Sequence, residues 1–123
     1  MKTPVTDERY EWLLARSEGS HITAIWYEIA GEYDSLEDER EEFLSVLERA
    51  LTEKRLALKK DGQWLTGTPQ EQVERFRLAF PRTRRPYAGR PDMDVGHWLY
   101  GLDCPGEVFW PVERDGQTHW VQG

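Results

Sequence analysis

The sequence predicts an α+β fold that is mainly helical, with about four helices and two short antiparallel β-hairpins. Apolar residues recur with helical spacing along four segments, and two Asp-Gly dipeptides each separate short runs that are typical of strands. The chain also has six Trp, five Tyr and four Phe, and each such side chain buries roughly 150–250 Å² when packed. Its 123 residues fit one domain, so we expect a single domain over residues 1–123.

The first two predicted helices cover residues 6–17 and 21–33. Thr6 is placed to cap the first, and the acidic residues that follow suit the positive end of the helix dipole. Ser20 is the expected cap of the second. Both helices have an apolar stripe that we expect to face the core. The stripe residues are Tyr10, Leu13 and Leu14 in the first helix, and Ile22, Ile25, Trp26, Ile29 and Tyr33 in the second.

The third predicted helix, residues 36–54, has the clearest division into two faces and starts after Asp34-Ser35. One face is apolar and the other is polar and mainly acidic. The apolar face consists of Leu36, Phe43, Leu44, Leu47, Ala50 and Leu51. The acidic face includes Glu37, Asp38, Glu41, Glu42 and Glu48.

The remaining elements are marked by turn and cap residues. An Asp-Gly pair between two short runs favours a two-residue hairpin turn. Thr68, Pro69 and Glu71 together predict the start of a fourth helix at 69–80, because they supply a cap, a proline at the first helical position and a capping box. A short helix is expected near 93–100, after an exposed arginine-rich loop. The predicted hairpins lie at 56–65, turning at Asp61-Gly62, and at 107–121, turning at Asp115-Gly116.

The net charge of −7 lies in the first half of the chain. Residues 1–55 contain 14 acidic against 7 basic residues, whereas residues 56–123 contain nine of each. Such an acidic field repels nucleic acid and anionic membranes and attracts basic partners. The single cysteine, Cys104, excludes an intramolecular disulfide, and the N-terminal residues do not resemble a signal peptide. We therefore expect a cytoplasmic protein that binds neither nucleic acid nor membrane.

The acidic stretch around the start of the third helix is the main candidate for a partner-binding surface. Its plainest interpretation is a solvated helix face with acids near the helix N-terminus. Like charges four residues apart mildly destabilise a helix, however, and only Arg40 interrupts the acids, so a docking surface for a basic protein is the alternative. The predicted partner-binding residues are Asp34, Glu37, Asp38, Glu41, Glu42 and Glu48.

Residues with catalytic or metal-binding chemistry form no recognised pattern. His97, Cys104 and His119 have no standard zinc spacing, and a thiol in the turn Asp103-Cys104 is better explained by packing than by nucleophilic catalysis. The acidic stretch lacks signs of a surrounding pocket. Neither a cofactor nor a metal is expected, and we predict that the protein is not an enzyme.

Five segments resemble a family of small uncharacterised bacterial proteins. They are 8–12 (ERYEW), 24–26 (AIW), 40–43 (REEF), 67–76 (GTPQEQVERF) and 103–110 (DCPGEVFW). Such proteins are similar to immunity proteins encoded beside polymorphic toxins, including contact-dependent growth-inhibition systems. The resemblance implies a cytosolic protein that binds and neutralises a cognate toxin domain, often a nuclease with a basic cleft, and it carries no functional residues across.

Other classes of function remain open. One is an acidic adaptor or regulatory protein-binding module, and a small enzyme built around Asp103, Cys104 and His119 is the less favoured alternative. The sequence also leaves open whether the interface is the acidic helix or the aromatic hairpins with the arginine loop at 82–90. The tryptophans in or beside the hairpins and the short helix are expected to lie mostly in the core, and any exposed Trp or Tyr would mark an interface, where both are enriched as hot spots. They are Trp64, Trp98, Trp110 and Trp120.

Overall fold

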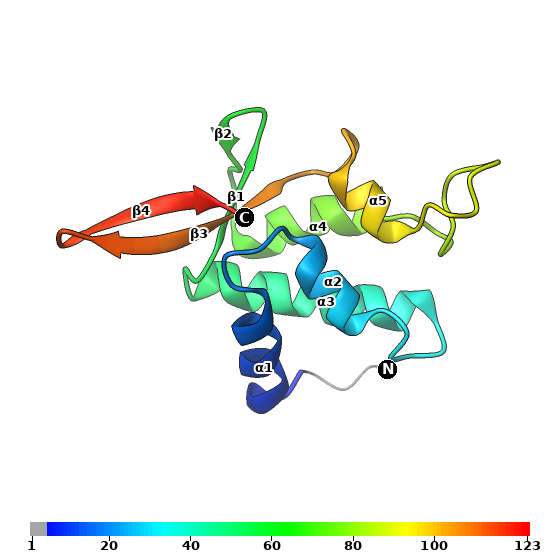
Figure 1. Ribbon diagram of the computed structural model, residues 1–123, viewed down its shortest axis with the longest axis horizontal. Helices are drawn as coiled ribbons and strands as arrows, with labels where there is room; N and C mark the ends of the chain where they lie inside the picture. The colour runs from blue at the N-terminus through cyan, green and yellow to red at the C-terminus, as the bar shows by residue number, and fades with distance from the viewer. Residues whose placement is uncertain (1–4) are drawn as a thin grey trace.

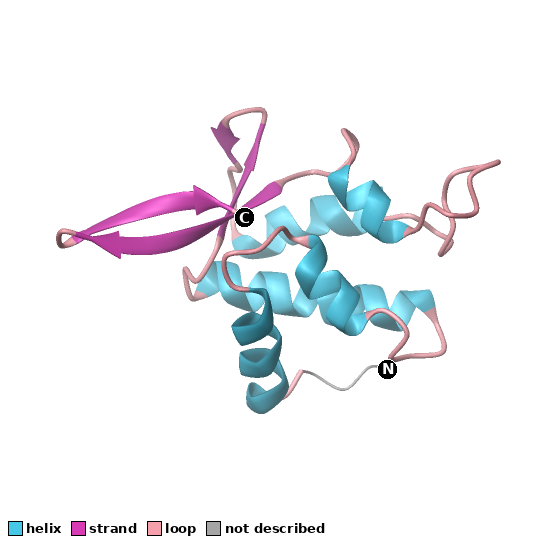
Figure 2. Cartoon of the chain, viewed as in Figure 1, coloured by secondary structure: helices cyan, strands magenta, loops and turns pink. Residues whose placement is uncertain are grey.

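The computed structural model describes residues 5–123, which form five α-helices and one four-stranded antiparallel sheet (Figure 1). The helices gather together, and the hairpin β3–β4 projects away from them (Figure 2). The predicted α+β, mainly helical class is confirmed. The elements are α1 (Asp7–Ser17), α2 (Thr23–Ile29), α3 (Leu36–Thr52), β1 (Ala57–Lys60), β2 (Gln63–Trp64), α4 (Pro69–Ala79), α5 (Val95–Tyr100), β3 (Glu107–Arg114) and β4 (Gln117–Gln122).

Three helices begin at side-chain caps, two of which, Thr6 and Thr68, were predicted. The Thr6 hydroxyl accepts the N–H of Arg9 at 3.1 Å, and the Ser35 hydroxyl accepts the N–H of Asp38 at 3.1 Å. Thr68 and Glu71 form the reciprocal capping box. Each cap satisfies a backbone donor that the first helical turn leaves without a partner.

The second helix is shorter than predicted. Ser20 is not its cap: α2 begins at Thr23, and the Ser20 carbonyl accepts the indole N–H of Trp110 at 2.7 Å. The helix ends at Ile29 because Gly31 takes a left-handed conformation, with φ of +88°. The N–H of Gly31 donates to one carboxylate oxygen of Glu39, at 2.6 Å. The left-handed glycine and this hydrogen bond from α3 together fix the end of the helix.

The two hairpins join into one sheet with the strand order β2-β1-β3-β4. Asp61 and Asp115 have φ of +53°, and the glycine after each also has positive φ, as the predicted two-residue turns require. The strands β1 and β3 pair antiparallel, with Leu58 opposite Val108. Pro111 lies two residues beyond Phe109, the last β3 residue paired with β1, so its missing N–H breaks no ladder bond to that strand.

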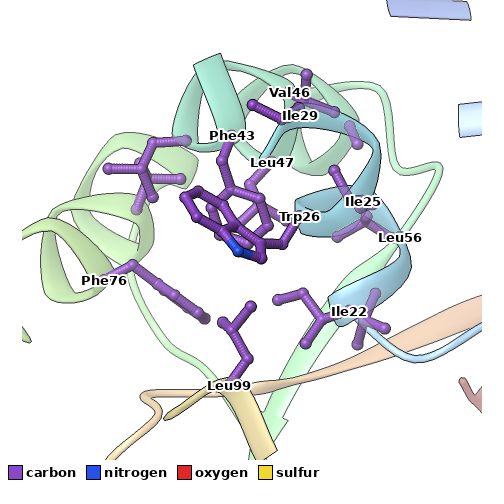
Figure 3. Close-up of a cluster of buried hydrophobic side chains, with 14 of the residues drawn as sticks. Ile22, Ile25, Trp26, Ile29, Phe43, Val46, Leu47, Leu56, Phe76 and Leu99 are labelled. Atoms are coloured by element: carbon purple, nitrogen blue, oxygen red, sulfur yellow. The ribbon is translucent and has the colours of Figure 1, made fainter. Parts of the chain in front are cut away.

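The core lies between the helices and one face of the sheet (Figure 3). The rings of Trp26 and Phe43 meet edge to face with centroids 5.7 Å apart, and Trp26 contacts Phe80 in the same way at 5.5 Å. Leu58 and Val108 bring the sheet into this core. No helix within residues 5–123 has both the length and the apolar character needed to cross a bilayer.

Candidate functional site

Glu42 does not lie on a solvated face, contrary to the prediction. It is 3% exposed, and one of its carboxylate oxygens accepts both Nε (3.1 Å) and Nη2 (2.8 Å) of Arg9 on α1. The Tyr33 hydroxyl donates to the other oxygen. These contacts neutralise the carboxylate inside the protein, so Glu42 is not available as a docking charge.

Glu41 and Glu39 also form contacts within the molecule. Glu41 is half-buried and accepts Nη2 of Arg77 at 2.9 Å and Nε of Arg40 at 2.8 Å. The hydrogen bond from Arg77 is the main reason that the pKa of Glu41 lies below its ordinary value. Glu39 is fully buried and pairs with Arg84 of the arginine loop. The acids of α3 thus bind α1, α4 and that loop together.

The acids that remain exposed cluster at the N-terminal end of α3. Asp34, Glu37 and Asp38 are exposed, and Nη2 of Arg40 lies 4.0 Å from the Glu37 carboxylate. Glu48 lies farther along the helix and is partly exposed. The acidic surface that the sequence predicted is therefore smaller, and its role in partner binding stays a prediction for these four residues.

Cys104 and the histidines belong to local structure. Cys104 is 3% exposed, its thiol donates to the Gly106 carbonyl at 3.3 Å, and burial raises its pKa to about 11. The Nδ1 atom of His97 accepts the N–H of Asp94 in a capping box. His119 is an exposed residue of β4. Among residues 5–123, no three His, Cys, Asp or Glu side chains form a group that could hold a metal ion.

The sheet has an aromatic face that the sequence did not locate. Because side chains alternate along a strand and paired residues share a face, the register places Lys59, Trp64, Phe109 and Trp120 on one side. The Trp64 ring lies edge to face with Phe109 (centroids 5.5 Å apart) and with Trp120 (5.9 Å). Trp64 and Trp120 belong to the two outermost strands, so the sheet curls to bring their rings into contact.

A groove lies beside this face, and we call it the aromatic groove. It has a volume of about 580 Å³ and lies between the C-terminal end of α3, the sheet and the start of α4. Its polar lining is limited to Thr52, Lys54 and Gln72, and Lys54 is its one ionisable lining residue within the described chain. Its main apolar lining residues are Leu51, Leu56, Trp64, Leu65, Pro69 and Trp120.

The groove offers apolar contact in place of acid–base chemistry. Its lining, taken over residues 5–123, brings no carboxylate, imidazole or thiol to its surface. Trp64 is 44% exposed, whereas Trp98 and Trp110 are buried in the core. A partly exposed tryptophan at the wall of a preformed apolar groove is the arrangement found at interface hot spots. The groove could therefore bind an apolar side chain of a partner.

The comparisons with known proteins are consistent with the resemblance to uncharacterised bacterial proteins. A family model described as "Protein of unknown function, DUF596" matches residues 51–121. An uncharacterized protein conserved in bacteria, from Neisseria meningitidis, has a similar fold with a TM-score of 0.75 and 25% sequence identity. The similarity covers 92% of this chain and 87% of that one. No curated protein matches the sequence.

The segment matched by the family model contains one of the two candidate surfaces and not the other. Every residue that lines the aromatic groove, from Leu51 to Trp120, lies within residues 51–121. The predicted acidic residues, from Asp34 to Glu48, all lie outside it. The groove is thus the candidate surface that lies within the part of the chain described by the family.

Proposed function

The chain belongs to DUF596, a family of unknown function, and we propose that it acts by binding another protein in its aromatic groove. The observation that carries the proposal is the contact between Trp64 and Trp120 at the wall of an apolar groove of about 580 Å³. Rigid aromatic side chains around a groove provide contact area at low entropic cost, and interfaces are enriched in them.

We propose further that the partner is a toxin domain of a bacterial competition system, which this protein neutralises in the cytosol as an immunity protein. Support comes from the five segments that resemble such families and from the net charge of −7. An acidic inhibitor is attracted to a basic toxin cleft at long range. Under this proposal Asp34, Glu37, Asp38 and Glu48 contribute to that attraction, while the groove forms the close contact.

Replacement of Trp64 tests this function. A fully buried tryptophan side chain removes up to roughly 250 Å² from solvent. Trp64 is 44% exposed, so about 110 Å² of its surface is available for a partner to bury. At about 25 cal/mol per Å², this area is worth about 2.8 kcal/mol, or roughly a hundredfold in Kd. We expect Trp64→Ala to weaken the complex by about that factor and to reduce protection of cells against the toxin.

Trp12 provides a matched control. It is 45% exposed on α1, outside the groove, so Trp12→Ala removes the same side chain at the same exposure. The assay is calorimetric titration with the toxin domain encoded beside the gene, together with growth rescue. Equal affinities for Trp64→Ala and the unchanged protein would contradict docking in the groove. Groove-dependent binding of a different protein, without growth rescue, would instead favour an adaptor.

A further inference from the structure

Two lysines border the aromatic groove without an ion pair to any residue that the structure describes. Lys54 lines the groove, and Lys59 lies on the aromatic face beside it. The rest of the molecule differs, because many of its arginines contact carboxylates. Examples are Arg9, Arg49, Arg55, Arg77 and Arg84. The two lysine charges are therefore available to a partner.

Lys54 occupies a backbone position that glycine usually takes. It follows Glu53, the C-cap of α3, and its φ is +60°. A left-handed conformation costs a residue with a side chain about 1–2 kcal/mol, and glycine is the common residue just past a helix end. The chain carries a lysine there, with its side chain exposed at the groove.

Lys59 places its charge directly on the aromatic wall. Its Nζ lies 4.4 Å from the ring centroid of Trp64 and 4.9 Å from that of Phe109. Its cross-strand neighbour is Glu107, but that carboxylate accepts the side-chain amide of Gln122 at 2.9 Å. The positive charge of Lys59 is thus held against Trp64, a ring of the groove wall, and against Phe109 beside it.

Building on the protein-binding role above, we propose that the aromatic groove takes a partner segment in which a large apolar side chain is flanked by one or two carboxylates. The apolar residue packs among Trp64, Trp120 and Leu65, and the carboxylates pair with Lys54 and Lys59. Complementary charges at the edge of an apolar contact fix its register and exclude segments of the wrong sign.

This local chemistry agrees with a partner that is basic as a whole. The net charge of −7 acts over distances up to a Debye length, about 8 Å at physiological salt, and so guides the first approach. The lysines act only at contact. A basic toxin domain that presents one acidic and apolar segment satisfies both requirements.

The test is selection of a random 12-residue peptide library, displayed on phage, against the folded protein. We expect the enriched peptides to share a Phe, Leu or Trp next to Asp or Glu, and to lose binding to Trp64→Ala. A synthetic peptide of the enriched sequence is then compared with its Glu→Gln version on two proteins, the natural chain and Lys54→Gly/Lys59→Gln. Glycine suits φ of +60°, so the double variant removes both charges without straining the backbone.

The double variant removes two partly exposed ion pairs, so the Kd of the acidic peptide is expected to rise about tenfold. The Gln version of the peptide should bind the double variant and the natural chain equally well. Asp115→Gly, at another left-handed position, is the control and should bind normally. Enriched peptides that need Trp64 but are neutral or basic would overturn this inference and leave the proposed function standing. If no peptide is enriched, or if the enriched peptides bind Trp64→Ala as tightly as the natural chain, both this inference and the proposed function are overturned. Self-association that Trp64→Ala abolishes would make a second copy the occupant, contrary to the proposal.

Discussion

Replacement of Glu42 by glutamine should destabilise the fold, although Glu42 was predicted from the sequence to be a docking charge. Its side chain is 4% exposed and accepts two hydrogen bonds from Arg9, whose own side chain is 25% exposed. Breaking a fully buried pair costs about 3–5 kcal/mol. Partial hydration of Arg9 and the remaining hydrogen bonds of glutamine reduce this, so we expect about 2 kcal/mol for Glu42→Gln. For a domain of this size the melting temperature should fall by about 8 °C.

The assay is urea unfolding followed by circular dichroism, with Glu37→Gln as the control. The Glu37 side chain is 77% exposed and lies 4.0 Å from Arg40, so its replacement should change stability by less than about 0.5 kcal/mol. A double-mutant cycle with Arg9→Gln should give a coupling of at least about 1 kcal/mol. Equal stability of Glu42→Gln and Glu37→Gln would refute the structural role assigned to Glu42.

Three further outcomes are expected. The Cys104 thiol, with a pKa of about 11, should react with a disulfide reagent at pH 7.5 more than about a hundredfold more slowly in the native protein than in urea. Burial lowers the pKa of His21, so the unfolded chain binds a proton on this residue more readily than the native protein does. The free energy of unfolding should therefore fall as the pH drops through about 6.5 and below. In unfolding measured at several pH values, His21→Phe should make this slope smaller. Stopped-flow association with a basic toxin domain should slow about tenfold at low salt, with a smaller change in dissociation, when three exposed acids are changed to lysine. These acids are Asp34, Glu37 and Asp38.

Local signals in the sequence predicted the elements well where local chemistry decides them. The caps at Thr6 and Thr68 and the turns at Asp61 and Asp115 depend on residues within a few positions, and all four are confirmed. The prediction that the second helix continues to residue 33 was wrong, because Gly31 turns left-handed after Ile29 and donates its N–H to Glu39, eight positions farther along the chain.

The candidate site depended on contacts between distant segments, so the sequence predicted it poorly. Glu42 pairs with Arg9 and Glu41 with Arg77, across 33 and 36 positions, and spacing along one helix cannot reveal such partners. The contact of Trp64 with Trp120 needs the pairing of β1 with β3 and the curl of the sheet. The sequence did identify the aromatic hairpins as an alternative interface, but not which tryptophans are exposed.

The most direct test of the proposed docking site is to follow the indole N–H signals of the ¹⁵N-labelled protein by NMR as the toxin domain is added. We predict that the signals of Trp64 and Trp120 shift or broaden at stoichiometric ratios. The signal of Trp12, equally exposed on α1, should remain, as should that of Trp110, whose indole N–H is bonded to the Ser20 carbonyl. Unchanged signals of Trp64 and Trp120 in a saturated complex would contradict binding in the aromatic groove.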